Sequence, residues 1–90
     1  MHYYRYYAKV QDGTYQSDIM YLIKSPTLFT MQQSEECLQF QQQYLKTVIL
    51  STTILSAELT LVTERVARSI MRRLERPMNS IPTVTVDQMA

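Results

Sequence analysis

Side chains that could perform catalysis are scarce in this 90-residue chain, which has one histidine, His2, and one cysteine, Cys37. A serine or cysteine nucleophile needs a histidine or another base beside it. In this chain the base would have to be His2, which lies close to the start of the sequence. We therefore expect no enzyme activity.

Metal and cofactor chemistry is not indicated either. A structural zinc ion needs four ligands, and Cys37 and His2 supply two. A phosphate-binding loop needs several glycines, whereas Gly13 is the single glycine. Glu35 and Glu36 are adjacent, and neighbouring helix residues point in different directions, so the two carboxylates are not a catalytic pair. In a first helical turn they would instead be stabilised by the positive end of the helix dipole. We predict no cofactor and no metal site, with Cys37 as a small apolar filler.

Tyrosine and basic residues alternate near the start of the chain, at Tyr3, Arg5, Tyr7 and Lys9. One strand face of this kind can stack bases and neutralise phosphates in single-stranded nucleic acid. It can also bind a protein, because tyrosine and arginine are enriched among the residues that contribute most to protein interfaces. We favour a protein partner, because Met20 and Leu22 are expected on the neighbouring strand, beside these residues on the same face. The predicted partner-binding residues are Tyr3, Arg5, Tyr7, Met20 and Leu22.

A second group of basic residues recurs at three- and four-residue steps in the segment ERVARSIMRRLER. Five arginines against Glu64 and Glu75 leave a local charge of +3. Such a helix face can bind phosphates or an acidic partner, but cations are also favoured near the C-terminal end of a helix. We predict a solvated face and keep nucleic-acid or acidic-partner binding as the alternative. The arginines are Arg65, Arg68, Arg72, Arg73 and Arg76.

Composition and charge indicate a small folded domain without general attraction to polyanions. Hydrophobic residues make up 46% of the chain and charged residues 19%, and the formal net charge is +1. A lone cysteine and the absence of an apolar leader predict a cytoplasmic location. The most apolar window, residues 44–62, contains Lys46 and Glu58 and is too interrupted for a span of about 20 apolar residues, so we expect no membrane partner.

The first element predicted is a β-hairpin over about residues 2–24. Asp12 and Gly13 favour a two-residue turn. That turn would place Tyr4 opposite Tyr21 and Tyr6 opposite Ile19 on one apolar face. We therefore expect Tyr4 and Tyr6 in the core.

A helical region is predicted over about residues 31–76. Apolar residues recur at seven-residue spacing, and Pro77 ends the pattern. Three helix-start signals compete, at Ser25, Thr30 and Ser34, and we place the start between Met31 and Glu35. Hydroxyl and β-branched residues make 51–53 a weak point, so the region is one long helix or two consecutive helices. The fold class is α+β in one domain, residues 1–76. Residues 77–90 form a tail that is flexible or adds a short edge strand.

The seven-residue spacing admits two interpretations: packing within the chain, or a helical interface with a second copy. We favour a homodimer, because the spaced residues and a hairpin that is apolar on both faces exceed what one small fold can bury. The predicted dimer seam is Leu45, Val48, Leu55, Leu59, Val62 and Val66.

These observations lead to one functional hypothesis and one alternative. The chain is expected to be a small non-enzymatic protein-binding module that acts as an adaptor, chaperone or inhibitor of an unidentified protein target. The alternative is a small nucleic-acid-binding regulator that uses the arginine face.

Overall fold

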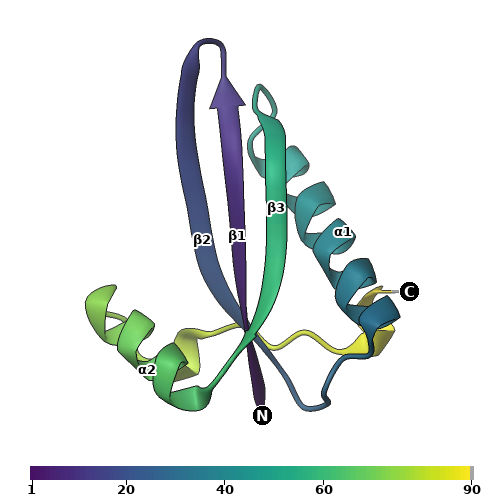
Figure 1. Cartoon of the computed structure of the whole chain (residues 1–90), viewed down its shortest axis with the longest axis vertical. Coiled ribbons are helices and arrows are strands. Elements are labelled where there is room, and N and C mark those ends of the chain that lie inside the picture. The colour runs from purple at the N-terminus through teal and green to yellow at the C-terminus, as the bar shows by residue number, and fades with distance from the viewer. Residues whose placement is uncertain (90) are drawn as a thin grey trace.

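A computed structural model describes residues 1–89, which form a three-stranded antiparallel sheet flanked by two helices (Figure 1). The order of strands across the sheet is β2-β1-β3. This architecture confirms the predicted α+β class and the N-terminal hairpin. The elements are β1 (His2–Asp12), β2 (Tyr15–Ser25), α1 (Met31–Val48), β3 (Thr53–Val62) and α2 (Glu64–Arg73), followed by short 3-10 helices at Met78–Ser80 and Val86–Met89.

The hairpin register differs by two residues from the one predicted. Tyr6 pairs with Tyr21 and Tyr4 with Ile23, because Gly13 and Thr14 form the turn in place of Asp12 and Gly13. Gly13 has φ +62° and stands at the first central position, where a type II′ turn requires glycine. A shift of two residues keeps each side chain on its predicted face.

The prediction of one long helix or two consecutive helices over residues 31–76 is wrong for residues 53–62, which form strand β3 between α1 and α2. Thr30 begins α1 with a capping box, and α1 ends before Ile49, whose backbone N–H still bonds to Leu45. The segment TILSAELTLV then pairs antiparallel with β1. β-branched and alternating apolar residues suit a strand, and the free edge of β1 provides a pairing that no local pattern reveals.

One sheet face is covered by α1 and holds most of the core. Tyr4, Tyr6, Ala8 and Val10 are buried there, which confirms the predicted core position of the two tyrosines. The Tyr4 hydroxyl accepts a hydrogen bond from the backbone N–H of Phe29 at 2.8 Å, and the two rings stack with centroids 4.6 Å apart. These contacts attach the start of the α1 segment to the central strand.

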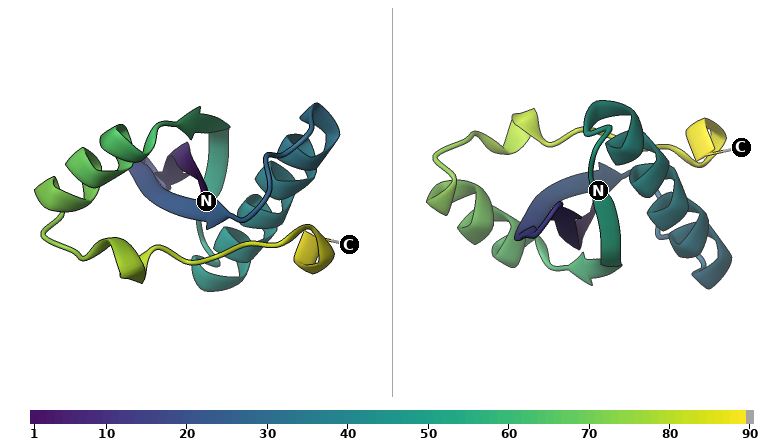
Figure 2. Two further views of the ribbon diagram at one scale, coloured as in Figure 1. Left: turned by 90° about the horizontal axis from the view of Figure 1, so that it is seen from below. Right: turned by 90° about the horizontal axis from the view of Figure 1, so that it is seen from above.

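Helix α2 lies on the opposite side of the sheet (Figure 2). Leu22 of β2 packs there against Ala67, Ile70 and Met71 of α2. The helix starts at a Thr63 cap and ends in a Schellman motif, with the N–H of Arg76 bonded to the Met71 carbonyl. α2 is therefore held close to the outer edge of β2.

The segment after α2 returns along β2. The Lys24 N–H donates to the Pro82 carbonyl at 3.0 Å, and the Val84 N–H donates to the Lys24 carbonyl at 2.8 Å. The result is an isolated parallel bridge between Lys24 and Thr83. This part of the predicted tail thus pairs with the sheet edge at a single residue of β2.

A candidate protein-binding groove

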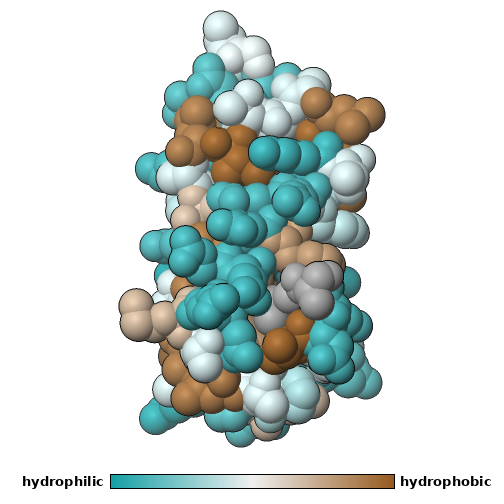
Figure 3. All heavy atoms as spheres, turned by 90° about the vertical axis from the view of Figure 1, so that its right-hand side faces the viewer, coloured by the Kyte–Doolittle hydropathy of each residue, from teal (hydrophilic) through white to brown (hydrophobic). Residues whose placement is uncertain are grey.

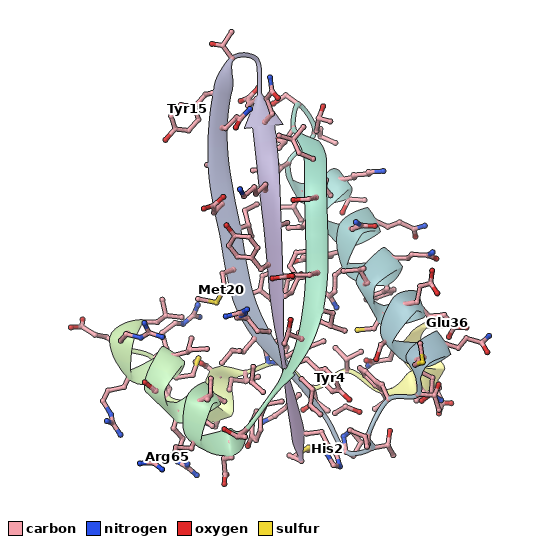
Figure 4. The ribbon with its side chains drawn as sticks, in the orientation of Figure 1. His2, Tyr4, Tyr15, Met20, Glu36 and Arg65 are labelled. Atoms are coloured by element: carbon pink, nitrogen blue, oxygen red, sulfur yellow. The ribbon has the colours of Figure 1, made fainter. Side chains whose placement is uncertain are left out.

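The predicted partner-binding residues are divided by helix α2. Leu22 is buried beneath the helix, so it is not a freely exposed contact, and Tyr3 and Met20 pack partly against the same cluster. Met20 extends from β2 towards α2 (Figure 4). Arg5 lies 3.8 Å from Glu58 of β3, and Tyr7 is half-buried on the same face. The predicted set is therefore not one open surface.

A groove of about 910 Å³ lies beside the outer edge of β2. Residues 20–23 of β2 line it, together with Phe40, Gln41 and Tyr44 of α1 on one side and Met71 and Leu74 on the other. Residues 80–84 close one end of it. Its walls therefore come from elements far apart in the sequence, which converge because α1 and α2 cover opposite faces of one sheet.

Several large apolar side chains of this groove are exposed. Phe40 is 40% exposed, Tyr44 58% and Leu74 46%. Arg76 is the one charged residue among those of 1–89 that line the groove. The groove is consequently apolar and open, with a positive charge at the end of the α2 segment.

The main chain of β2 also faces this groove. In an antiparallel ladder, residues alternate between bonding to one neighbouring strand and to the other side. Lys24 bonds outward to residues 82 and 84, so the N–H and C=O groups of Met20 and Leu22 also point outward. Within residues 1–89 no hydrogen bond satisfies these groups at Met20 and Leu22. The β2 edge is therefore a row of donors and acceptors between two apolar walls.

The α1 wall is held in place by a polar contact in the core. The Tyr21 hydroxyl donates a hydrogen bond to the Gln41 side-chain oxygen. Burial raises the pKa of the Tyr21 hydroxyl above its ordinary value, so the phenol stays protonated at neutral pH. Tyr21 thereby fixes the helix turn that also carries Phe40 and Tyr44.

Cys37 is buried beneath the first turns of α1, in a cluster with Tyr4, Ile23 and Phe29. Burial raises the pKa of its thiol to about 11, although a side-chain hydrogen bond with Gln41 lowers the pKa by a smaller amount. The thiolate is the reactive form of cysteine, so the native environment suppresses nucleophilic chemistry at Cys37. Its side chain acts as an apolar filler, in the position the sequence predicted.

The predicted arginine face lies on and just after α2, and all five side chains are exposed. Arg68 forms an ion pair with Glu64 at 3.1 Å. In the described part of the chain, the other four arginines have no carboxylate within 4.0 Å. Arg65 points away from the sheet at the lower end of α2 (Figure 4). The structure thus brings four of these arginines to one exposed helix, with Arg76 at the groove.

The predicted dimer seam is not a helical stripe, because its residues lie on three elements. Leu45 is buried against the sheet, and Leu59 and Val62 pack within the chain's own clusters. Val48, Leu55 and Val66 are exposed at separate places on α1, β3 and α2. The seven-residue spacing is therefore a coincidence: apolar positions of α1, β3 and α2 happen to continue the same spacing.

Sequence reasoning missed Phe40, Tyr44 and Leu74 as site residues. Phe40 and Tyr44 lie on α1 and Leu74 is the C-cap of α2. All three are apolar positions outside the main apolar pattern, which is the signal that could have identified them. On the side of the molecule that carries α1, the surface is hydrophilic over much of its middle, with separate hydrophobic patches (Figure 3). An apolar residue outside the core pattern is therefore a sign of a surface site in this chain.

No group of three or more histidine, cysteine, aspartate or glutamate side chains in residues 1–89 is arranged to hold a metal ion. Neither α1 nor α2, nor any other helix of that range, is long and apolar enough to cross a membrane. Comparisons with family models, curated proteins and solved structures found no match.

Proposed function

We propose that the chain is a non-enzymatic protein-binding module that holds a partner protein in the groove beside β2. The observation that carries this proposal is the combination of exposed Phe40, Tyr44 and Leu74 with an unpaired strand edge. Aromatic residues are enriched in protein interfaces, and an apolar groove exposed to water is stabilised when a partner covers it. The module acts as an adaptor, chaperone or inhibitor by occupying its target.

The proposal keeps the cytoplasmic location expected from the sequence. The chain has one cysteine, and its thiol is buried in the core. A buried free thiol that forms no disulfide is compatible with a reducing compartment.

Affinity capture with a matched pair of variants tests the proposal. Leu74→Glu places a charge in the groove wall, whereas Leu50→Glu alters an 87% exposed residue on the loop between α1 and β3. In cells that express the chain, a partner should be captured by the wild type and by Leu50→Glu, but not by Leu74→Glu. If both variants capture the same proteins as the wild type, the groove is not the binding site.

We also propose that the chain forms a homodimer, through the outer edge of β3. Within residues 1–89, β3 pairs only with β1, and it carries a single charged residue, Glu58. Leu55 and Leu61 are about half exposed along this strand, at 48% and 52%. A long apolar edge strand is a ready template for pairing with another copy.

Light scattering on a sizing column tests the homodimer. The wild type should elute with twice the chain mass at low and high salt. Leu55→Lys combined with Leu61→Lys should elute as a monomer, because lysine on an edge strand opposes pairing. A wild-type monomer, or a dimer that is unchanged by both lysines, would exclude pairing through β3.

The exposed arginines of α2 support a second candidate function, binding of nucleic acid. Arg65, Arg72 and Arg73 have no acidic partner within 4.0 Å among the described residues, so their charges are available to phosphates. If several phosphates are contacted, affinity falls steeply as salt rises, and Arg68→Glu with Arg72→Glu abolishes binding. Binding that is independent of salt would eliminate this candidate.

A further inference from the structure

We infer that the groove binds an extended hydrophobic segment of the partner protein, which pairs with β2 as an added strand and places an acidic residue beside Arg76. This inference rests on the proposed function and specifies the chemistry of the partner. It follows from the main chain of β2, from the two walls and from the charge of Arg76 in the groove lining.

The main chain requires an extended occupant. Met20 and Leu22 direct their N–H and C=O groups into the groove, where residues 1–89 provide no partner for them. The chain's own residues 82–84 already make this kind of pairing at the adjacent outward residue, Lys24. An incoming strand would continue the same row of hydrogen bonds, which is how peptides add to exposed sheet edges.

The walls define the side chains of that occupant. An added strand directs alternate side chains to opposite faces of the sheet. On the α1 side these side chains would meet Phe40 and Tyr44, and on the α2 side Met71 and Leu74. Both walls are apolar, so every residue of the inserted stretch should be apolar, as in strands that are buried on both faces.

The length of the groove floor limits the inserted stretch. Residues 20–23 of β2 line the groove, and residues 80–84 close it near Lys24. At about 3.3 Å per residue, the four floor residues correspond to an inserted run of roughly four residues. A short apolar run is therefore sufficient, and a folded domain is not required at this site.

Charge complementarity defines the residue that flanks the run. Arg76 is the lining residue with a charge, and the lining contains no carboxylate in the described part of the chain. Arg72 and Arg73 end α2 just before it. A partner carboxylate beside Arg76 would gain a charge-assisted hydrogen bond, whereas a lysine would be repelled.

Selection from a phage-displayed library of random peptides provides the test. We expect selected peptides to share an apolar run of about four residues flanked by aspartate or glutamate. Each selected peptide is then synthesised in a second form, N-methylated at alternate residues, which removes main-chain donors and keeps the side chains. The N-methylated form should bind at least about tenfold more weakly, because the β2 groups lose their partners.

Variants of the chain distinguish the possible failures. Arg76→Glu should weaken the acidic peptide by about tenfold and favour a version with lysine in place of the acid. If Leu74→Glu abolishes binding but N-methylation has no effect, the groove binds protein without strand addition, so this inference fails while the proposed function stands. If no peptide is selected, or if Leu74→Glu leaves binding unchanged, both fail. If Leu74→Glu converts a dimer of the chain into a monomer, the occupant is a second copy and the inference is overturned.

Discussion

Tyr4 and Tyr6 lie on the same buried face of β1, and we predict that replacement by phenylalanine lowers stability at Tyr4 but not at Tyr6. The Tyr4 hydroxyl accepts the Phe29 N–H at 2.8 Å in a buried position. Tyr4→Phe leaves that N–H without a partner and away from water. Such a buried unsatisfied donor costs about 1–3 kcal/mol of unfolding free energy.

The Tyr6 hydroxyl is in the opposite situation. Tyr6 is fully buried, and no hydrogen-bond partner for its hydroxyl lies within residues 1–89. The ring packs against Tyr21 with centroids 5.0 Å apart, and phenylalanine preserves that contact. Tyr6→Phe removes a hydroxyl that is buried without compensation, so it should leave stability unchanged or raise it by about 1 kcal/mol.

Urea unfolding of the wild type and the two variants measures the difference. A gap of about 2 kcal/mol between the variants corresponds to roughly 8–16 °C in melting temperature for a domain of this size. Hydrogen exchange at the Phe29 amide provides a control, because its protection should fall in Tyr4→Phe alone. If Tyr6→Phe destabilises the chain as much as Tyr4→Phe, the assignment of the two hydroxyls is refuted.

Three further predictions concern backbone strain and the buried thiol. Glu75 has φ +56°, at a helix-end position that favours glycine, so Glu75→Gly should raise stability by about 0.5–1 kcal/mol in thermal unfolding, whereas Glu75→Ala should not. A Cβ at Gly13 meets no atom within 4 Å, so Gly13→Ala should lose about 1–2 kcal/mol through backbone strain alone, and Gly13→Asn should lose less; equal losses would contradict this explanation. The raised pKa of Cys37, about 11 against an ordinary 9.0, means that its contribution to stability is complete below pH 9 and is lost as pH rises towards 11. Cys37→Ala should flatten that part of the pH profile, and native Cys37 should resist alkylation at pH 8 until the chain is unfolded.

Local signals in the sequence were sufficient for the hairpin, for the start of α1 and for the core tyrosines. Gly13 identified the turn. Whether Asp12 or Thr14 accompanies it depended on the turn type, and the structure has Thr14. Thr30 and Gln33 form the capping box that was one of three competing start signals. These features depend on neighbouring residues, which is why they were predictable.

β3 and the groove were not predictable in the same way. Apolar residues such as Leu55, Leu59 and Val62 fit a helix spacing, and the pairing that makes them a strand is with β1, about fifty residues earlier. The groove arises where α1 and α2 approach the edge of β2 from opposite faces. Met20 and Leu22 lie on the predicted face of the sheet, but they pair with Tyr7 and Arg5 in place of the predicted Arg5 and Tyr3. Their outward-facing main chain appears only once the strand order is known.

Hydrogen exchange at four consecutive β2 amides, with and without a selected peptide, tests the central claim most directly. The amides of Met20 and Leu22 point into the groove, whereas those of Tyr21 and Ile23 bond to β1. Strand addition predicts that Met20 and Leu22 exchange rapidly in the free chain and become protected on binding, while Tyr21 and Ile23 stay protected throughout. A bound peptide that leaves Met20 and Leu22 unprotected would contradict the account.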